Sequence, residues 1–144
     1  MNVINHIVVG LDGSTNARRA AEWSASLAAM TGAEVTAVHA LGLLTPGDDG
    51  EPVPSHGMRA AIAAKLEHEW CAPFAVVGLT PRCQVIDGNP VQVLLNAATE
   101  HGADLIVVGS RGMGGFPELL LGSTSTQVSQ HSKCPVLIVP SDTT

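Results

Sequence analysis

Residues 105–127 read LIVVGSRGMGGFPELLLGSTSTQ, and this stretch decides the interpretation of the whole chain. Its first four residues form an unbroken apolar run rich in β-branched side chains, which predicts a buried parallel strand. Its last five residues are typical of a helix start, and Thr124 and Gln127 have the spacing of a capping box. Between these ends lie Gly109, Gly112, Gly114, Gly115 and Gly122. A strand, a glycine-rich turn and a helix N-terminus together predict an anion site, because backbone N–H groups can approach a phosphate there.

Arg111 is the only cation in residues 109–122, which we call the glycine stretch. Backbone amides would therefore make most of the contacts to a phosphate. The stretch does not match a Walker A loop, because no Gly-Lys-Ser/Thr occurs in it, and it does not match the dinucleotide fingerprint G-x-G-x-x-G. The alternative is that the glycines only build a tight loop and a helix cap. Their number, between an apolar strand and a Ser/Thr-rich helix start, favours the anion site.

The composition indicates one globular domain over residues 1–144, with 45% hydrophobic residues, 3% aromatic residues and a formal charge of −6. No basic cluster exceeds the pair Arg18–Arg19, so a nucleic-acid surface is not expected. No apolar run approaches the ~20 residues of a membrane span, and no signal-peptide pattern opens the chain. The three cysteines are an odd number without C-x-x-C spacing, which predicts reduced thiols in a cytoplasmic protein.

Alternating strand and helix patterns run along the chain. The sequence predicts strands at residues 6–11, 34–40, 82–86, 105–108 and 135–139. It predicts helices from the residue after Asn16 to Gly32, over 57–72 with Met58 and Trp70 buried and Pro73 as its limit, from Pro90 to Gly102, and from 123 to 132. Residues 41–55 are expected to form a long loop. The pattern predicts an α/β fold, a doubly wound and mostly parallel five-stranded sheet with helices on both faces.

Ligands of such sheets bind at the carboxyl ends of the strands, where the winding reverses. The two loops richest in polar and turn residues follow the first strand, at Asp12–Asn16, and the fourth strand, in the glycine stretch. The residues alone do not fix the strand order. If the first and fourth strands are neighbours, these two loops face each other.

Three motifs resemble the universal stress protein family. The spacing Gly109-x2-Gly112-x9-Gly122-Ser123-Thr124 is similar to the family's ATP-binding signature. The opening VGLDGS at residues 9–14 and the ending CPVLIVP at residues 134–140 also resemble the family, so the resemblance covers nearly the full chain. It implies the strand order 3-2-1-4-5 and ATP, with or without Mg²⁺, held between the two polar loops.

The resemblance also implies roles for single residues. Asp12 would contact the nucleoside, and Ala40 would lie at the adenine. A carboxylate beside a triphosphate would be repelled, so Asp12 fits ribose hydroxyls, an adenine N–H or a Mg²⁺ ion better. Asp12 as a turn residue, Ser123 and Thr124 as caps only, and Arg111 as a solvating residue remain alternatives. The candidate nucleotide-binding residues are Gly10, Asp12, Ala40, Gly109, Arg111, Gly112, Gly122, Ser123 and Thr124.

Three functions fit these observations. The favoured hypothesis is an ATP-binding stress-response or regulatory module with at most slow hydrolysis, because no lysine, base or second acid is placed to drive in-line attack. The second is an adenylating-type enzyme, although the turn Gly10–Ser14 lacks that class's paired glycine and no substrate domain is present. The third is a dimerisation module whose pocket is empty or takes another nucleotide.

The order 3-2-1-4-5 also predicts a homodimer. It makes the last strand, Val136–Val139, an edge without charge or internal proline, the features that normally protect an edge. The opposite edge, residues 82–86, has the polar residues expected of a solvated strand. Two copies related by a twofold axis could pair through the last strand and cover it.

Overall fold

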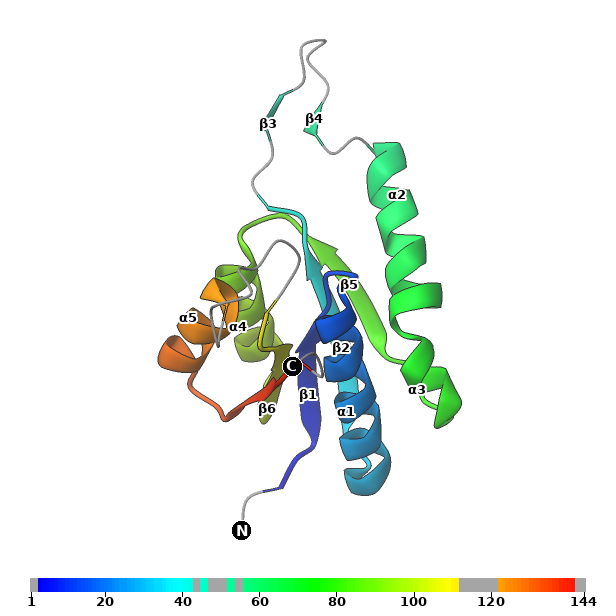
Figure 1. The fold of residues 1–144 in the computed structure, drawn as a ribbon, viewed down its shortest axis with the longest axis vertical. Coiled ribbons are helices and arrows are strands. Elements are labelled where there is room, and N and C mark those ends of the chain that lie inside the picture. Colours follow the sequence, from blue (N-terminus) through cyan, green and yellow to red (C-terminus); the bar gives the residue numbers. More distant parts are fainter. Residues whose placement is uncertain (1–2, 43–44, 47–51, 54–55, 112–121, 142–144) are drawn as a thin grey trace.

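The computed structural model describes residues 3–42, 45–46, 52–53, 56–111 and 122–141 of the 144-residue chain. Its centre is a parallel five-stranded sheet in the order β5-β2-β1-β6-β7 (Figure 1). The strands are β1 His6–Gly10, β2 Glu34–Ala40, β5 Arg82–Ile86, β6 Leu105–Gly109 and β7 Val136–Val139. Counted along the chain this is 3-2-1-4-5, so the predicted fold class and strand order are confirmed.

Helices cover both faces of the sheet (Figure 1). One face carries α1 Thr15–Thr31, α2 His56–Lys65, η1 Leu66–Trp70 and α3 Ala72–Val76. The other carries α4 Pro90–His101 and α5 Ser123–His131. Side chains of a strand alternate between faces, so in β1 Ile7 and Val9 pack in the first core cluster and Val8 in the second. All three are fully buried, as a central strand requires.

The ends of α1 and α4 follow from local chemistry. The Ser14 hydroxyl accepts a hydrogen bond from the N–H of Ala17 at 3.0 Å, and the Asn89 side chain caps α4 in the same way. Gly32 and Gly102 end the two helices in the left-handed conformation that favours glycine. The boundaries at Asn89, Gly32 and Gly102 confirm the predictions, whereas α1 begins at Thr15, earlier than the predicted start after Asn16. Within α1 the buried positions are almost all small, which lets the helix approach the sheet closely.

The prediction of one continuous helix over residues 57–72 is wrong, because the structure has three successive helical segments there. The structure has α2, then the π-helical turn η1, then α3, and Pro73 lies in the first turn of α3, where its missing N–H leaves no hydrogen bond unmade. Met58, which was expected in the core, is 52% exposed. A π turn contains one more residue than an α turn, so it changes the direction in which all later side chains of the helix point.

The π turn sets which side chains face the core. In an α-helix, Cys71 would lie about 140° around the axis from Leu66, five residues earlier. The N–H of Cys71 instead donates to the carbonyl of Leu66 at 3.1 Å, which brings the two onto one face. Both are buried, together with Phe74.

The predicted loop at residues 41–55 contains two short paired strands, β3 Thr45–Pro46 and β4 Pro52–Val53. Its other residues from 43 to 55 lie outside the described part. At the base of this segment, Gly42 and Gly88 exchange two backbone hydrogen bonds of 2.9 Å. No helix in the described part of the chain is long and apolar enough to cross a bilayer.

Candidate functional site

Asp12 occupies the turn between β1 and α1. β1 ends at Gly10, and the N–H of Leu11 still donates to the carbonyl of Val38 in β2 at 2.9 Å. One carboxylate oxygen of Asp12 accepts a hydrogen bond from the N–H of Ser14 at 2.9 Å, which fixes the turn. The side chain is half-buried, so it serves the turn and still reaches the surface.

Asn16 is the residue that the sequence analysis missed. It lies in the first turn of α1 and is only 9% exposed. Its side-chain oxygen accepts hydrogen bonds from the Ser110 hydroxyl at 3.1 Å and from the Arg111 N–H at 2.6 Å. Its side-chain nitrogen donates to the carbonyl of Val139 at 3.2 Å. One buried amide thus joins the loop after β1 to the start of the glycine stretch and to the last strand.

Position 109 requires a glycine because Asn16 lies against it. A Cβ at this position would come within 3.0 Å of the Asn16 side-chain carbon and oxygen and 3.1 Å from its backbone carbon. Contacts this short force a shift in the neighbour, and the neighbour is held by three hydrogen bonds. The glycine that sequence analysis assigned to a phosphate loop is therefore also required for packing.

Hydrogen bonds join the two described ends of the glycine stretch. The N–H of Ser110 donates to the carbonyl of Val139 at 2.8 Å. The carbonyl of Ser110 accepts bonds from the N–H of Gly122 and from the hydroxyl of Ser125, the latter at 2.9 Å. Gly112 and the residues up to 121 lie outside the described part. The structure thus brings together Gly109, Arg111 and Gly122 and does not test Gly112.

The start of α5 differs from the predicted capping box. Gly122 is the N-cap residue, and no side chain caps the helix. Ser123 and Thr124 are its first two residues, and the side chain of Gln127 donates to the Ser123 hydroxyl at 2.9 Å rather than pairing with Thr124. The Thr124–Gln127 box is therefore wrong. The alternative in which Ser123 and Thr124 serve only as caps therefore lacks a side-chain capping bond in the structure.

Ala40 is the last residue of β2 and lies beside Ile86 of β5. Because β1 and β2 are parallel neighbours, Ala40 and Asp12 both lie at the carboxyl edge of the sheet. The preceding residue, His39, points elsewhere, since its Nδ1 bonds the carbonyl of Leu11 at 2.8 Å and its ring meets Trp70 edge-on at 5.1 Å.

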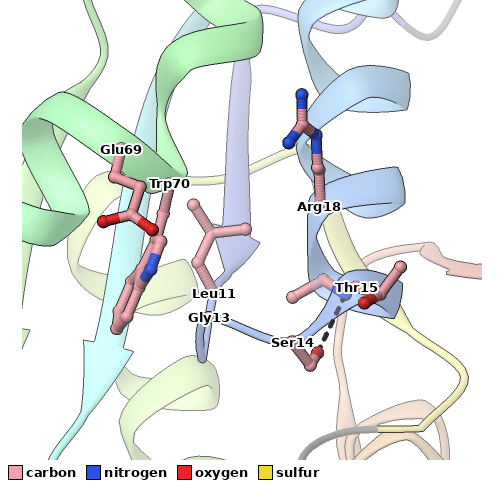
Figure 2. A pocket seen from close by; sticks show the side chains of 8 residues that line it. Leu11, Gly13, Ser14, Thr15, Arg18, Glu69 and Trp70 are labelled. Carbon is pink, nitrogen blue, oxygen red and sulfur yellow. Dashed lines mark hydrogen bonds between the residues drawn. The ribbon is translucent and has the colours of Figure 1, made fainter.

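A pocket of about 240 Å³ lies between the start of α1 and η1 (Figure 2). Trp70 forms one wall and lies against Gly13, whose φ of +83° suits glycine and where a Cβ would come within 2.7 Å of the indole. Arg18 and Glu69 stand on opposite sides of it (Figure 2). The lining residues are Leu11, Gly13, Ser14, Thr15, Ala17, Arg18, Glu69 and Trp70. The pocket thus borders the Asp12 turn and includes none of the predicted nucleotide-binding residues.

The described residues offer no ready metal site. Among them, no three His, Cys, Asp or Glu side chains are grouped so that they could hold an ion.

Comparison with known proteins identifies the family. The model of the Universal stress protein family matches residues 4–140. The chain belongs to this family. It is 36% identical over 141 residues to the "Universal stress protein in QAH/OAS sulfhydrylase 3'region" of Thermus aquaticus, covering 92% of this chain and 96% of the relative. It is 35% identical over 147 residues to universal stress protein YxiE of Bacillus subtilis, covering 95% and 99%.

A solved structure agrees in fold. A crystal structure of a universal stress protein in complex with cAMP superimposes with a TM-score of 0.71 at 29% identity, covering 96% of this chain and 98% of the other. The universal stress protein fold therefore extends over essentially the whole sheet and both helical layers.

Proposed function

We propose that the protein is an ATP-binding regulatory module of the stress response that hydrolyses ATP slowly at most. The observation that carries the proposal is the side chain of Asn16, which bonds both Ser110 and Arg111. It holds the loop after β1 beside the start of the glycine stretch, at the edge where doubly wound sheets bind ligands. The relative solved with cAMP, at 29% identity, supports an adenine nucleotide as the ligand.

The residues divide between the two ends of the nucleotide. Asp12 binds ribose hydroxyls or the adenine amino group, with Gly10 and Ala40 beside the nucleoside. Backbone N–H groups of the glycine stretch and of the first turn of α5 bind the phosphates, since helix starts favour anions. The phosphate-end residues in this proposal are Gly109, Arg111, Gly112, Gly122, Ser123 and Thr124.

The positions of the lysines support the proposal of slow hydrolysis. The chain has two, Lys65 and Lys133. Lys65 ends α2, and Lys133 precedes β7 at the amino edge of the sheet, away from the glycine stretch. Rapid phosphoryl transfer generally needs a cation on the leaving phosphates and a group that positions the nucleophile. Arg111 is the one cation that the sequence supplies within the glycine stretch.

Titration calorimetry with ATP, ADP, AMP and cAMP tests the proposal. We expect ATP to bind with a micromolar Kd, which corresponds to about −8 kcal/mol. Tighter binding of cAMP would overturn the preference for ATP and leave an adenine-nucleotide module. Binding of none of them would favour a dimerisation module with an empty pocket. Adenylation of an added acceptor, with release of pyrophosphate, would favour the enzyme.

We also propose a homodimer formed through β7. β7 is an edge of the sheet, and its residues Val136, Leu137 and Ile138 are half-buried in the single chain. The opposite edge, β5, carries Arg82 and Gln84 instead. Pairing of two β7 edges about a twofold axis would cover the apolar strand and close the assembly.

We further propose that the protein is cytoplasmic. The basis is its cysteines, since all three are free thiols, as a reducing compartment maintains them.

A further inference from the structure

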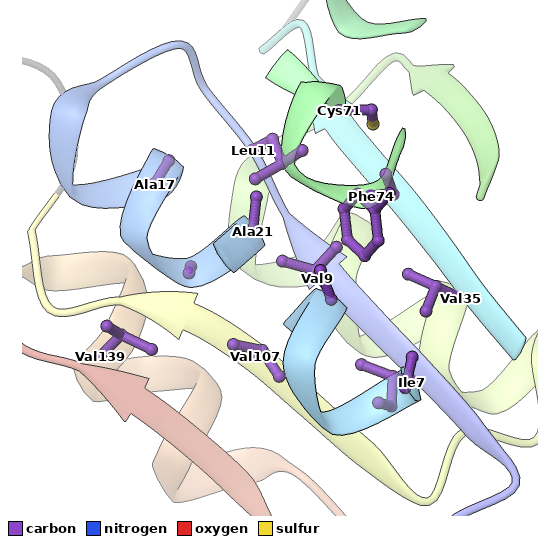
Figure 3. Close-up of a cluster of buried hydrophobic side chains, with 14 of the residues drawn as sticks. Ile7, Val9, Leu11, Ala17, Ala21, Val35, Cys71, Phe74, Val107 and Val139 are labelled. Carbon is purple, nitrogen blue, oxygen red and sulfur yellow. The ribbon is translucent and has the colours of Figure 1, made fainter. Parts of the chain in front are cut away.

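Two cysteines meet on the face of the sheet that carries α1 and α3. Cys71 lies between η1 and α3 and is 4% exposed (Figure 3). Cys83 is the second residue of the edge strand β5 and is half-buried. Their sulfur atoms are 3.7 Å apart, within thiol hydrogen-bond distance, although the residues come from different elements. The contact depends on the π turn, which brings Cys71 onto the core-facing side.

The two thiols are unequal. A hydrogen bond from Cys71 lowers the pKa of Cys83, whereas the same bond and burial raise the pKa of Cys71. Cys83 is also the more accessible of the two. Since the thiolate is the reactive form, an oxidant would meet Cys83 first, with Cys71 directly behind it.

The third thiol, Cys134, lies too far from Cys71 and Cys83 to pair with either of them. Cys134 packs against the core cluster on the other face of the sheet, where its neighbours include the Ser132 hydroxyl at 3.6 Å. Cys71 and Cys83 both belong to the opposite cluster. The sheet itself therefore separates Cys134 from the pair.

We propose that Cys71 and Cys83 form a peroxide-responsive oxidation site that closes to an intramolecular disulfide. The Cys83 thiolate attacks one oxygen of hydrogen peroxide, the O–O bond breaks, and the departing hydroxide takes up a proton to become water. Cys83 is then a sulfenic acid. Cys71 loses its proton and attacks the Cys83 sulfur, so that the S–S bond forms, the S–O bond breaks and a second water leaves. Two electrons pass from the two thiols to the peroxide.

The site requires little movement. The sulfur atoms must approach from 3.7 Å to the disulfide length of about 2.05 Å, which side-chain rotation and a small shift of η1 against β5 can provide. The bond would tie the end of η1 to the edge strand. This proposal is independent of nucleotide binding, because neither thiol belongs to the proposed nucleotide site.

Peptide mapping tests it on the full chain. Trypsin cuts after Lys65, Arg82, Arg111 and Lys133, so the three cysteines fall in peptides 66–82, 83–111 and 134–144. The reduced, folded protein is treated with equimolar hydrogen peroxide, alkylated and digested without reductant. We expect peptides 66–82 and 83–111 to be linked, two hydrogens lighter than their sum, and Cys134 to be alkylated. Alkylation of both Cys71 and Cys83 after oxidation, or linkage through Cys134 or between chains, overturns the proposal.

Three variants supply controls. Cys134→Ser should leave the link unchanged. Cys71→Ser should leave a sulfenic acid on Cys83 that dimedone traps, whereas Cys83→Ser should leave Cys71 reduced. Trapping on Cys71 rather than Cys83 would reverse the assignment of the attacking thiol and contradict the proposed order. If a variant fails to fold, the wild-type map alone decides whether the pair forms.

Discussion

Asn16 is the single side chain on which the candidate site depends most. Asn16→Ala should lower the free energy of unfolding by about 1–3 kcal/mol, because the buried Ser110 and Val139 and the partly buried Arg111 N–H lose their hydrogen bonds to it. Urea denaturation measures this change. Asn16→Asp keeps the accepting oxygen and sets a carboxylate against the Val139 carbonyl, so it should not rescue stability. An alanine variant as stable as the wild type would contradict the bridging role.

Asp12 combines a turn contact with the proposed nucleoside contact. Asp12→Ala should weaken ATP binding about tenfold to a hundredfold, the value of a hydrogen bond to a charged group. Asp12→Asn keeps the acceptor for the Ser14 N–H and so isolates the charge. Calorimetry with and without Mg²⁺ then separates ribose bonding, where the asparagine recovers part of the affinity, from metal binding, where it recovers little. Unchanged affinity in both variants would leave Asp12 a turn residue only.

His6 predicts a pH dependence of stability. Its Nε2 lies 2.8 Å from the Thr36 hydroxyl, and its ring stacks on His101 at 5.5 Å. Burial, His101 and Arg82 lower the pKa of His6 and outweigh the opposite effect of Glu34 and Asp104. The folded state therefore binds a proton less readily than the unfolded chain, so this contribution is present above pH 6.5 and is lost as the pH falls through the lower, folded value.

The measurement is the urea midpoint between about pH 7.5 and pH 5. His6→Gln, which can still bond Thr36, should flatten the decline over this range. An equally steep decline in the variant would assign the pH dependence to other groups.

At the scale of elements, the start of α5 tests the phosphate end of the site. Gly122→Val should abolish ATP binding, because a β-branched side chain blocks the approach of phosphate to the first helical N–H groups. The fold should survive, since the φ of −76° at Gly122 suits any residue and a poor N-cap costs about 1 kcal/mol. Gly122→Ser, with a preferred cap residue, is the matched control for stability. Equal ATP affinity in the valine variant would show that the phosphate site is misplaced.

Local chemistry explains which elements the sequence predicts well. Helix caps such as Ser14 and Gly32 depend on residues within one turn of the helix end, so the sequence offers them as candidates. The π turn was missed because the whole stretch from Met58 to Trp70 was fitted to one α-helical period. The buried set Leu66, Cys71 and Phe74 is spaced by five and then three residues, and this irregular spacing was the available signal.

At the scale of the whole molecule, the strand order was predicted through the family resemblance rather than from residues. The order makes the loop after β1 and the start of the glycine stretch neighbours, but the contact through Asn16 that joins them was not foreseen. In the sequence, Asn16 looks like one turn residue among several, because its partners Ser110 and Val139 are close in space and distant in sequence. Side chains that link elements in this way carry no periodic or motif signal. The pocket beside Trp70 was missed for the same reason.

The proposed homodimer gives a prediction for the whole molecule. Sedimentation of the wild type should show a species near twice 14.8 kDa. Leu137→Lys should shift it toward the monomer, because a lysine in β7 places a charge on the edge that pairs. Arg82→Lys on the opposite edge, β5, is the control and should leave the dimer intact. A wild-type monomer at tens of micromolar protein would overturn the proposal.

The bond between Asn16 and Val139 spans 123 positions of sequence, and this has a consequence for synthesis on the ribosome. β1, at the centre of the sheet, emerges early, and β7, whose carbonyl completes the bonding of Asn16, is the last strand of the sheet to be made. The glycine stretch thus leaves the ribosome before the strand that anchors it. Ser110 and Asn16 gain their common partner only when β7 docks. We therefore expect a nucleotide at the proposed site to stabilise the protein only after β7 has docked, and not to assist the folding of the growing chain.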